Sequence, residues 1–182
     1  PGATLVRATF HRYVIDANRD PSGQSLYPGQ NTTGLVPLTD FDGRPIWTRE
    51  PDAAEVAARL AAFHAPYHEA LSAEMDRVRA AHGVAVLYDC HSIRSEIPFL
   101  FPGKLPDFNI GTDSGRSCDP RIERAAEETC RDAGTTVVNG RFRGGSATRH
   151  FGQPDRGWHA IQMELAQSTY LAEQHPPFAW DE

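Results

Sequence analysis

His91 is well placed to do chemistry because it ends an apolar run. The run Val84–Leu87 passes through Tyr88 into Asp89, Cys90 and His91. An apolar, β-branched run is typical of a buried parallel strand. Ligands of open α/β sheets bind at the carboxyl ends of the strands, so this imidazole is expected to face a crevice. It could ligate a metal, move a proton or hydrogen-bond a substrate; the alternative is a histidine that only satisfies nearby backbone groups.

Further polar residues follow the other predicted strand ends, and in a parallel sheet these ends meet at one edge. They are Asn18 and Arg19 after the first strands, Arg94 after His91, Arg141, Arg143, Arg149 and His150 in the loop 141–158, and Glu164 near the end of the last strand. Guanidinium groups bind carboxylates through two parallel hydrogen bonds. Several arginines at one rim of an acidic protein therefore indicate an anionic small molecule.

Glu164 stands among Ala160, Ile161, Met163 and Leu165. Burial among apolar neighbours disfavours the charged carboxylate, so its pKa is expected to be raised, which suits a general acid or base. The alternative is a buried salt bridge to one of the arginines. Solvated loop charges are the alternative for Arg141 and Arg143.

Arg149 follows the turn Gly144–Ser146, whose two glycines allow the backbone to approach a ligand closely. Two other arrangements are disfavoured. Cys90 and His91 are adjacent on a strand and point to opposite faces, which argues against a Cys–His nucleophile. His64 and His68 are four apart on a helix but lie among its packing residues, so a shared metal is not expected.

Bulk properties limit the class of protein. The 182 residues carry a formal net charge of −6, which argues against nucleic acid as a partner. No apolar run is long enough to cross a bilayer, so no membrane partner is expected. The three cysteines form no CxxC pair. We therefore expect one domain over residues 1–182, a cytoplasmic location and an oligomeric state that the sequence leaves open.

Strand and helix patterns alternate along the chain, which indicates an α/β fold with a mostly parallel sheet flanked by helices. Asp52 and Glu55 form a plausible capping box for the first helix, and Pro66 is expected to kink or divide it. The expected elements are strands over 4–8 and 13–16, an irregular region over 20–50, a helix over 52–83, a strand over 84–92, a loop over 92–119, a helix from 119 to before 134, a strand over 135–138, a loop over 141–158 and a strand over 159–165.

A series of motifs, in order along nearly the whole chain, resembles the N-formylglutamate amidohydrolase (N-formylglutamate deformylase) family. The motifs are Tyr13–Gly23, Ser25–Gly29, Asp89–Ser95, Gly103–Asn109, Ser117–Pro120, Asn139–Gly145, Thr148–Gly152 and Gln162–Gln167. The resemblance implies a fold similar to that of zinc carboxypeptidases and aspartoacylase, a phosphorylase/hydrolase-like fold. It implies hydrolysis of N-formyl-L-glutamate to formate and glutamate, late in a bacterial route of histidine breakdown.

The resemblance also implies roles for particular residues. His91 matches a ligand of a single divalent metal, expected to be zinc, and Glu164 matches the general base toward a metal-bound water. Asn18 and Arg19 match a pair that binds a substrate carboxylate. The other carboxylate, or the carbonyl, is expected to contact Arg149, with Arg94 or Arg141.

One departure qualifies these expectations. Members of the family normally begin with a further segment that supplies the other metal ligands, and nothing of that kind precedes Pro1. We therefore expect a truncated core of such an enzyme, because a catalytic zinc normally has three protein ligands. Two alternatives stay open: a catalytically inactive carboxylate-binding fragment or subunit, and a related amidohydrolase for another N-acyl amino acid.

Overall fold

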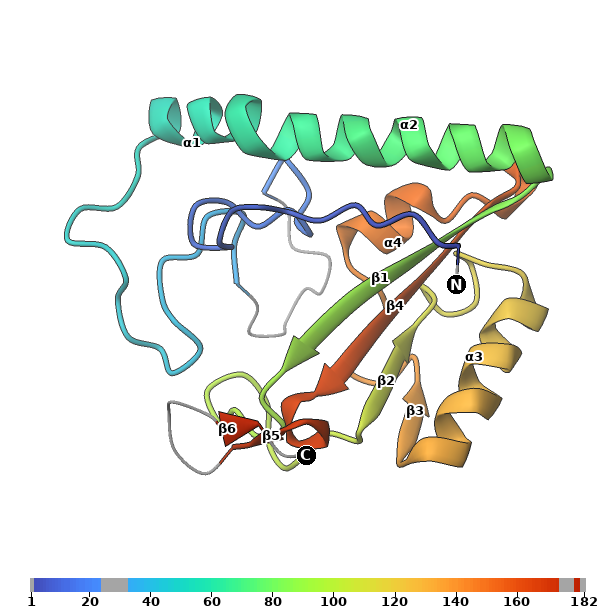
Figure 1. Cartoon of the computed structure of the whole chain (residues 1–182). Helices are drawn as coiled ribbons and strands as arrows, with labels where there is room; N and C mark the ends of the chain where they lie inside the picture. Colours follow the sequence, from blue (N-terminus) through green and yellow to red (C-terminus); the bar gives the residue numbers. More distant parts are fainter. Residues whose placement is uncertain (1, 24–32, 174–178, 181–182) are drawn as a thin grey trace.

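The computed structural model describes residues 2–23, 33–173 and 179–180, so the motif over 25–29 lies outside the described residues. Its main sheet has the strand order β1-β4-β2-β3 (Figure 1). These strands are β1 (Ala85–Ile93), β2 (Phe108–Gly111), β3 (Thr136–Val138) and β4 (Trp158–Ala166). A separate two-stranded sheet joins β5 (Leu171–Ala172) and β6 (Ala179–Trp180).

The main sheet is mixed rather than mostly parallel. The β1–β4 and β2–β3 pairs are parallel, whereas β2 pairs with β4 in the antiparallel sense. The predicted α/β class is thus confirmed and the predicted strand direction is corrected. The cause is β2, which lies inside the segment predicted as a loop over 92–119. It is short, and it reverses the direction of the sheet between β4 and β3.

One long helical rod lies across the top of the sheet in Figure 1. It consists of α1 (Ala53–Arg59), a π turn (Leu60–His64) and α2 (Ala65–His82). The Asp52 side chain caps it by accepting a hydrogen bond from the Glu55 N–H at 2.9 Å. Proline lacks an N–H, and its ring crowds the preceding turn. The chain widens into the π turn just before Pro66, so the predicted division of this helix is confirmed.

The remaining helices cover the two faces of the sheet. Helix α3 (Pro120–Ala133) packs against Ile161 and Met163 of β4. Helix α4 (Ser146–Phe151), which lies inside a predicted loop, packs with α2 against Trp158 and Ala160. Two short 3-10 helices, Pro154–Arg156 and Gln167–Thr169, flank β4. Alternate residues of β4 therefore face opposite helical layers, as the two-residue period of a strand requires.

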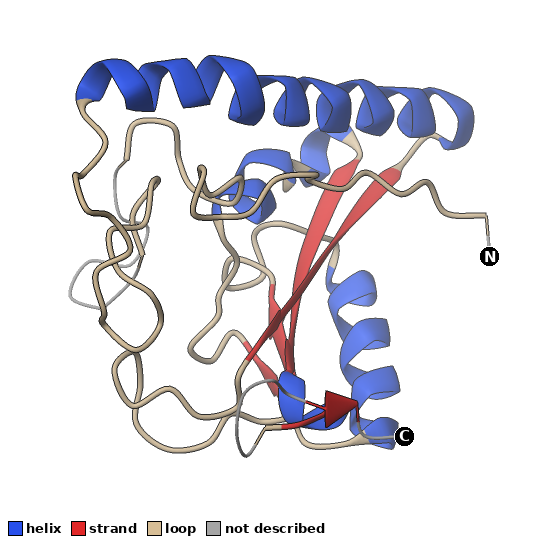
Figure 2. Cartoon of the chain, turned by 60° about the vertical axis from the view of Figure 1, so that its left-hand side comes forward, coloured by secondary structure: helices blue, strands red, loops and turns tan. Residues whose placement is uncertain are grey.

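The two strands expected near the N-terminus are absent from the described residues, and that prediction was wrong. Residues 2–9 form an extended segment that runs along the helical rod and beside β1 (Figures 1 and 2). Leu5, in the middle of the predicted strand over 4–8, is 82% exposed, so this segment is not a buried strand. Residues 12–14 form a turn, with the Val14 N–H donating to the His11 carbonyl. An alternating pattern makes a strand only where a neighbouring strand can pair with it.

Candidate active site

The register of β1 and β4 collects four polar side chains on one face. Asp89 is paired with Gln162, and His91 is paired with Glu164, near the carboxyl ends of both strands. Because side chains alternate along a strand, all four lie on the face that packs against α2 and α4 further back. Sequence reasoning missed Asp89 and Gln162, although each stands two residues before a predicted site residue and therefore shares its face.

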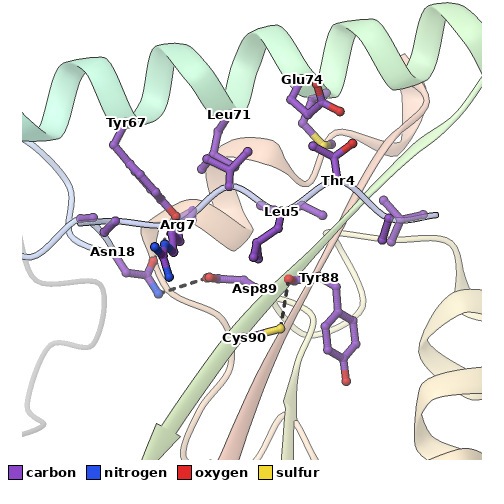
Figure 3. Close-up of a pocket in the computed structure, with 18 of the residues that line it drawn as sticks. Thr4, Leu5, Arg7, Asn18, Tyr67, Leu71, Glu74, Tyr88, Asp89 and Cys90 are labelled. Carbon is purple, nitrogen blue, oxygen red and sulfur yellow. Dashed lines mark hydrogen bonds between the residues drawn. The ribbon is translucent and has the colours of Figure 1, made fainter. Parts of the chain in front are cut away.

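Asn18 ties this cluster to the loop before α4. Its Nδ2 lies 3.0 Å from His91 Nε2 and donates to Asp89 Oδ2 at 3.2 Å, a contact drawn in Figure 3. Its Oδ1 accepts a hydrogen bond from the Ala147 N–H at 2.9 Å. Both ends of the amide are thus engaged by protein groups. This arrangement positions Asp89, the partner of His91, and leaves little of Asn18 for a ligand.

Gln162 and Gly145 complete the packing behind the cluster. Gln162 Oε1 accepts a hydrogen bond from the Gly145 N–H at 2.7 Å, and Gln162 Nε2 lies 3.5 Å from Glu164 Oε2. A Cβ atom on Gly145 would lie only 2.5 Å from Asn18 Oδ1, well inside a van der Waals contact. The glycine is therefore required here by close approach of the Asn18 amide.

A cavity opens in front of these residues. Its wall includes five residues predicted for the site, namely Asn18, Arg19, His91, Arg141 and Glu164. Arg12, Phe41 and Gln162 also line it and were not predicted. The structure therefore brings together an imidazole, a carboxyl group and several guanidinium groups that are far apart in the sequence.

A second, larger cavity of about 700 Å³ adjoins the first (Figure 3). It lies between the N-terminal segment, α2 and β1. The two cavities share Arg12, Asn18 and His91 in their walls. Cys90 also lines the larger cavity, and burial together with the Asp89 charge raises the pKa of its thiol. A thiol in that state is a poor nucleophile at neutral pH.

Burial sets the acid–base character of Glu164. Its residue is only 7% exposed, and desolvation raises its pKa to about 7 against the opposing charges of His91 and Arg12. The raised pKa predicted from its apolar neighbours is thus confirmed. Within the described part of the chain, Glu164 forms no ion pair, so the buried-salt-bridge alternative is not what the structure shows.

His91 is paired with Asp89. Burial acts to lower the pKa of the imidazole, but the hydrogen bond that His91 donates to Asp89 and the charges of Asp89 and Glu164 outweigh it, so the pKa is raised. The His91 Nε2 to Asp89 Oδ1 distance is 2.9 Å. An imidazolium paired in this way is both oriented and electrostatically balanced.

Arg94 and Arg149 do not line this cavity, and their roles in substrate binding stay predictions. Arg94 Nη2 is 2.5 Å from Asp42 Oδ1, because Arg94 follows the last residue of β1 and turns away into the loop. Arg149 sits on α4, with its Nε 3.4 Å from Asp113 Oδ1. It lines a separate cavity together with His64, His68 and His150.

The two histidines of the helical rod hold the turn that carries Asn18 and Arg19. His64 Nε2 lies 3.0 Å from the Arg19 carbonyl oxygen, and His68 Nε2 lies 2.8 Å from the Ala17 carbonyl oxygen. Their rings stack with centroids 4.3 Å apart. These contacts fix the turn that carries Asn18 and Arg19 against the helical rod.

The donors expected for zinc do not form a complete centre among the described residues. No group of three His, Cys, Asp or Glu side chains there is arranged to hold a metal ion, whereas a catalytic zinc normally has three protein ligands. His91 Nε2 is also within hydrogen-bond distance of both Asn18 and Asp89. The residues present therefore do not fit a metal centre by themselves.

The fold and the cavity define an α/β protein in which a buried carboxyl group of near-neutral pKa faces guanidinium groups, an arrangement suited to hydrolysis of an anionic substrate. The family model described as N-formylglutamate amidohydrolase matches residues 1–171. The chain therefore belongs to the N-formylglutamate amidohydrolase family. The enzyme class predicted from the motifs is confirmed.

Two relatives carry the name N-formylglutamate deformylase. The one from Pseudomonas aeruginosa is 48% identical over 183 residues, covering 98% of this chain and 68% of its own length. The one from Pseudomonas putida is 48% identical over 179 residues, covering 96% of this chain and 67% of its own length. The chain thus spans about two thirds of the length of these curated relatives.

Solved structures agree with the fold. A crystal structure of N-formylglutamate amidohydrolase from Ralstonia eutropha JMP134 matches with a TM-score of 0.74 and 25% identity, over 91% of this chain and 66% of that one. A gene product from Agrobacterium tumefaciens matches with a TM-score of 0.62 and 23% identity, over 86% of this chain and 58% of that one, which supports the fold alone. The finer likeness to zinc carboxypeptidases stays a prediction.

No helix in the described part of the chain is long and apolar enough to cross a membrane.

Proposed function

We propose that this chain hydrolyses N-formyl-L-glutamate to formate and L-glutamate. Family membership and the names of the Pseudomonas relatives support this substrate. The observation that carries the proposal is the cavity in which Glu164, with a pKa of about 7, lies with Arg12, Arg19 and Arg141. A general base works best when its pKa is near the working pH, and arginines suit a substrate with two carboxylates.

Glu164 takes the proton in the proposed reaction. As a water oxygen attacks the formyl carbon, the Glu164 carboxylate accepts the proton that the water loses. The carbon–nitrogen bond then breaks, and the same group returns the proton to the leaving amine of glutamate. The guanidinium groups hold the dicarboxylate in place, and such positioning lowers the barrier by several kcal/mol in well-aligned systems.

The Asp89–His91 pair supports this chemistry from the wall of the cavity. Asn18 donates to Asp89, which accepts from the His91 Nε2–H, and His91 lies beside Glu164 in the strand register. The positive charge on His91 opposes the rise in the Glu164 pKa that burial causes. The pair thereby keeps part of the Glu164 population ionised at neutral pH, which a general base requires.

A formate-release assay tests the proposed function. Purified protein is given N-formylglutamate, and formate is followed with a coupled dehydrogenase. We expect turnover with the formyl substrate and much less with N-acetylglutamate. Faster turnover of the acetyl substrate would indicate a related N-acyl amino acid amidohydrolase. Absence of turnover, with glutamate still bound in calorimetry, would indicate a carboxylate-binding fragment.

Dependence on a divalent metal, with zinc as the expected ion and His91 as one donor, is a separate part of the proposal. No step above passes through a metal, because the described residues supply too few ligands. If a metal is required, dialysis against a chelator abolishes formate release and added zinc restores it. Elemental analysis of the purified chain gives the stoichiometry, and full activity of the metal-free protein would contradict this part.

The setting of the reaction is also proposed from the family. We propose that it serves late in bacterial histidine breakdown, in the cytoplasm. Growth of the source cell on histidine after deletion of the coding sequence, with accumulation of N-formylglutamate as the readout, checks this setting.

A further inference from the structure

A buried carboxylate lies between two arginines beside the cavity. Asp16 is 2% exposed, and its Oδ1 accepts a hydrogen bond from the Asn18 N–H at 3.0 Å. Its Oδ2 is buried without a hydrogen-bond partner. That oxygen lies 3.7 Å from Arg12 Nη2 and 3.7 Å from Arg19 Nη1. Asp16 thus holds two guanidinium groups near each other through charge rather than through hydrogen bonds.

The two arginines differ in what they have left to donate. Arg19 donates from Nε and Nη2 to the carbonyl and hydroxyl oxygens of Thr33, at 2.8 and 2.9 Å. Its Nη1 donates to the Asn18 carbonyl oxygen at 2.9 Å. These bonds use three of the five N–H donors of a guanidinium group and fix Arg19 to the chain. Arg19 contributes charge to the cavity and has fewer remaining donors than Arg12.

The N–H donors of Arg12, in contrast, are not used by the described residues. Within residues 2–23, 33–173 and 179–180, it donates no hydrogen bond; its contacts are the charge of Asp16 and the Phe41 ring, whose centroid lies 5.5 Å from the guanidinium carbon. Its side chain is 33% exposed, and it lines both the small and the large cavity. A guanidinium group has five N–H donors in a planar fork that matches a carboxylate.

The local charge also fits one carboxylate. Two guanidinium groups and one carboxylate leave a single positive charge at this part of the wall. Burial dominates the raised pKa of Glu164, and the charge of Arg12 acts against it, so Arg12 lies within electrostatic reach of the reacting group. A ligand bound to Arg12 in this cavity would therefore share it with Glu164.

We propose that Arg12, held in place by Asp16 and Phe41, binds one carboxylate group of the dicarboxylate substrate. This inference rests on the proposed function and deepens it. It shifts the main carboxylate contact from Asn18 and Arg19, whose polar atoms are engaged by the protein, to a residue that the motifs did not single out.

Steady-state kinetics with three substrates tests the proposal. They are N-formylglutamate, N-formylglutamine and the α-amide of N-formylglutamate, so that each carboxylate is neutralised in turn. For Arg12→Gln we expect KM for N-formylglutamate to rise by about 10- to 100-fold, the usual worth of a charge-assisted pair, with kcat changed far less. For one of the two amides the effect of the substitution disappears. Arg12→Lys, which keeps the charge, restores part of the loss.

Arg131→Gln, on the exposed surface of α3, is the matched control and keeps wild-type kinetics. An equal loss on all three substrates, or a fall in kcat with KM unchanged, would overturn the proposal. Either result would mean that Arg12 acts on the reacting carbonyl or through the fold. Unchanged kinetics in Arg12→Gln would overturn it as well.

Calorimetric binding of glutarate separates this inference from the proposed function. If the wild-type chain releases no formate but binds glutarate, and Arg12→Gln weakens that binding by about 10-fold or more, the proposed function fails and this inference stands. If the wild type releases formate and Arg12→Gln binds glutarate as Arg131→Gln does, this inference fails and the function stands. A wild type that does neither overturns both.

Discussion

Two cavities of this molecule gather histidine and arginine side chains, and they differ in how those side chains are satisfied. In the cavity beside α4, His64 and His68 contact backbone carbonyl oxygens, and Arg149 lies against Asp113. In the cavity at the end of β1 and β4, Glu164 is buried without an ion pair among the described residues, and Arg12 keeps its donors. Residue type alone thus does not mark a reactive site. The distinguishing feature is an ionisable side chain that forms no ion pair or no hydrogen bond with the described protein groups around it.

The largest effect is expected from Glu164→Gln. Glutamine has nearly the same shape but cannot accept the proton, so kcat for formate release should fall by about 10²- to 10⁴-fold. Circular dichroism and the thermal midpoint should stay close to those of the wild type, because the charged form is not favoured at this buried position. A variant that keeps more than half of the wild-type rate would remove Glu164 from the role of base.

A smaller effect is expected from Asn18→Ala. This change leaves the Ala147 N–H without its acceptor and frees the Asp89–His91 pair to move. We expect a loss of about 1–3 kcal/mol in the free energy of unfolding, the usual cost of an unsatisfied buried group. We also expect a fall in kcat/KM of about 10- to 100-fold from misplacement of the site. Urea unfolding and kinetics measure the two effects separately, and a change in KM alone would instead favour a direct substrate contact.

A further effect is expected from His68, in the cavity beside α4, on the pH dependence of protein stability. Burial lowers the pKa of His68 below its usual 6.5, with the hydrogen bond to Ala17 acting in the opposite sense. The unfolded chain therefore binds this proton at a higher pH than the folded chain. The contribution of His68 to stability is fully present above about pH 6.5, the unfolded pKa, and declines as the pH falls toward the folded pKa.

His68→Gln, whose amide can still donate to the Ala17 carbonyl, should show a flatter decline in urea midpoint between pH 7.5 and pH 5.5 than the wild type. The same slope in both proteins would show that His68 does not titrate differently in the folded and unfolded states.

The smallest effect is expected from Arg149→Gln. Its kinetics test whether Arg149 binds substrate, as the sequence predicts, or lies away from the substrate, as the structure indicates. If Arg149 binds substrate, as the motif predicts, Arg149→Gln raises KM by at least about 10-fold. The structure places it in the other cavity against Asp113. Loss of a partly exposed pair of that kind should change kcat/KM by no more than about fivefold. Initial rates over a range of substrate concentrations separate the two values.

The sequence predicted well those features that depend on neighbours along the chain. The strands at 84–92 and 159–165, the cap at Asp52 and the helix that begins near 119 follow from local patterns. The raised pKa of Glu164 follows from its apolar neighbours. The strand β2 was missed because four residues after a proline- and glycine-containing loop carry little periodicity.

Features that depend on long-range pairing could not be predicted in this way. The register that sets His91 beside Glu164 is fixed by contacts between strands 73 residues apart in sequence. Arg12 is significant only because Asp16 and Phe41 come to lie beside it. The predicted strand over 13–16 was wrong for the same reason, since no strand of the described residues lies beside it. The motif at 148–152 located Arg149 in the sequence but not in space.

Gly145 has a consequence for how this site can change over time. The Asn18 amide fills the space that any side chain at position 145 would need. Any other residue at this position would introduce a methyl group or more, and the amide would have to move away from Asp89. A mutation at position 145 can therefore disturb the cluster of Asn18, Asp89 and His91 without altering any of those side chains. Position 145, which contributes only backbone atoms to the site, therefore restricts which mutations the site can accept.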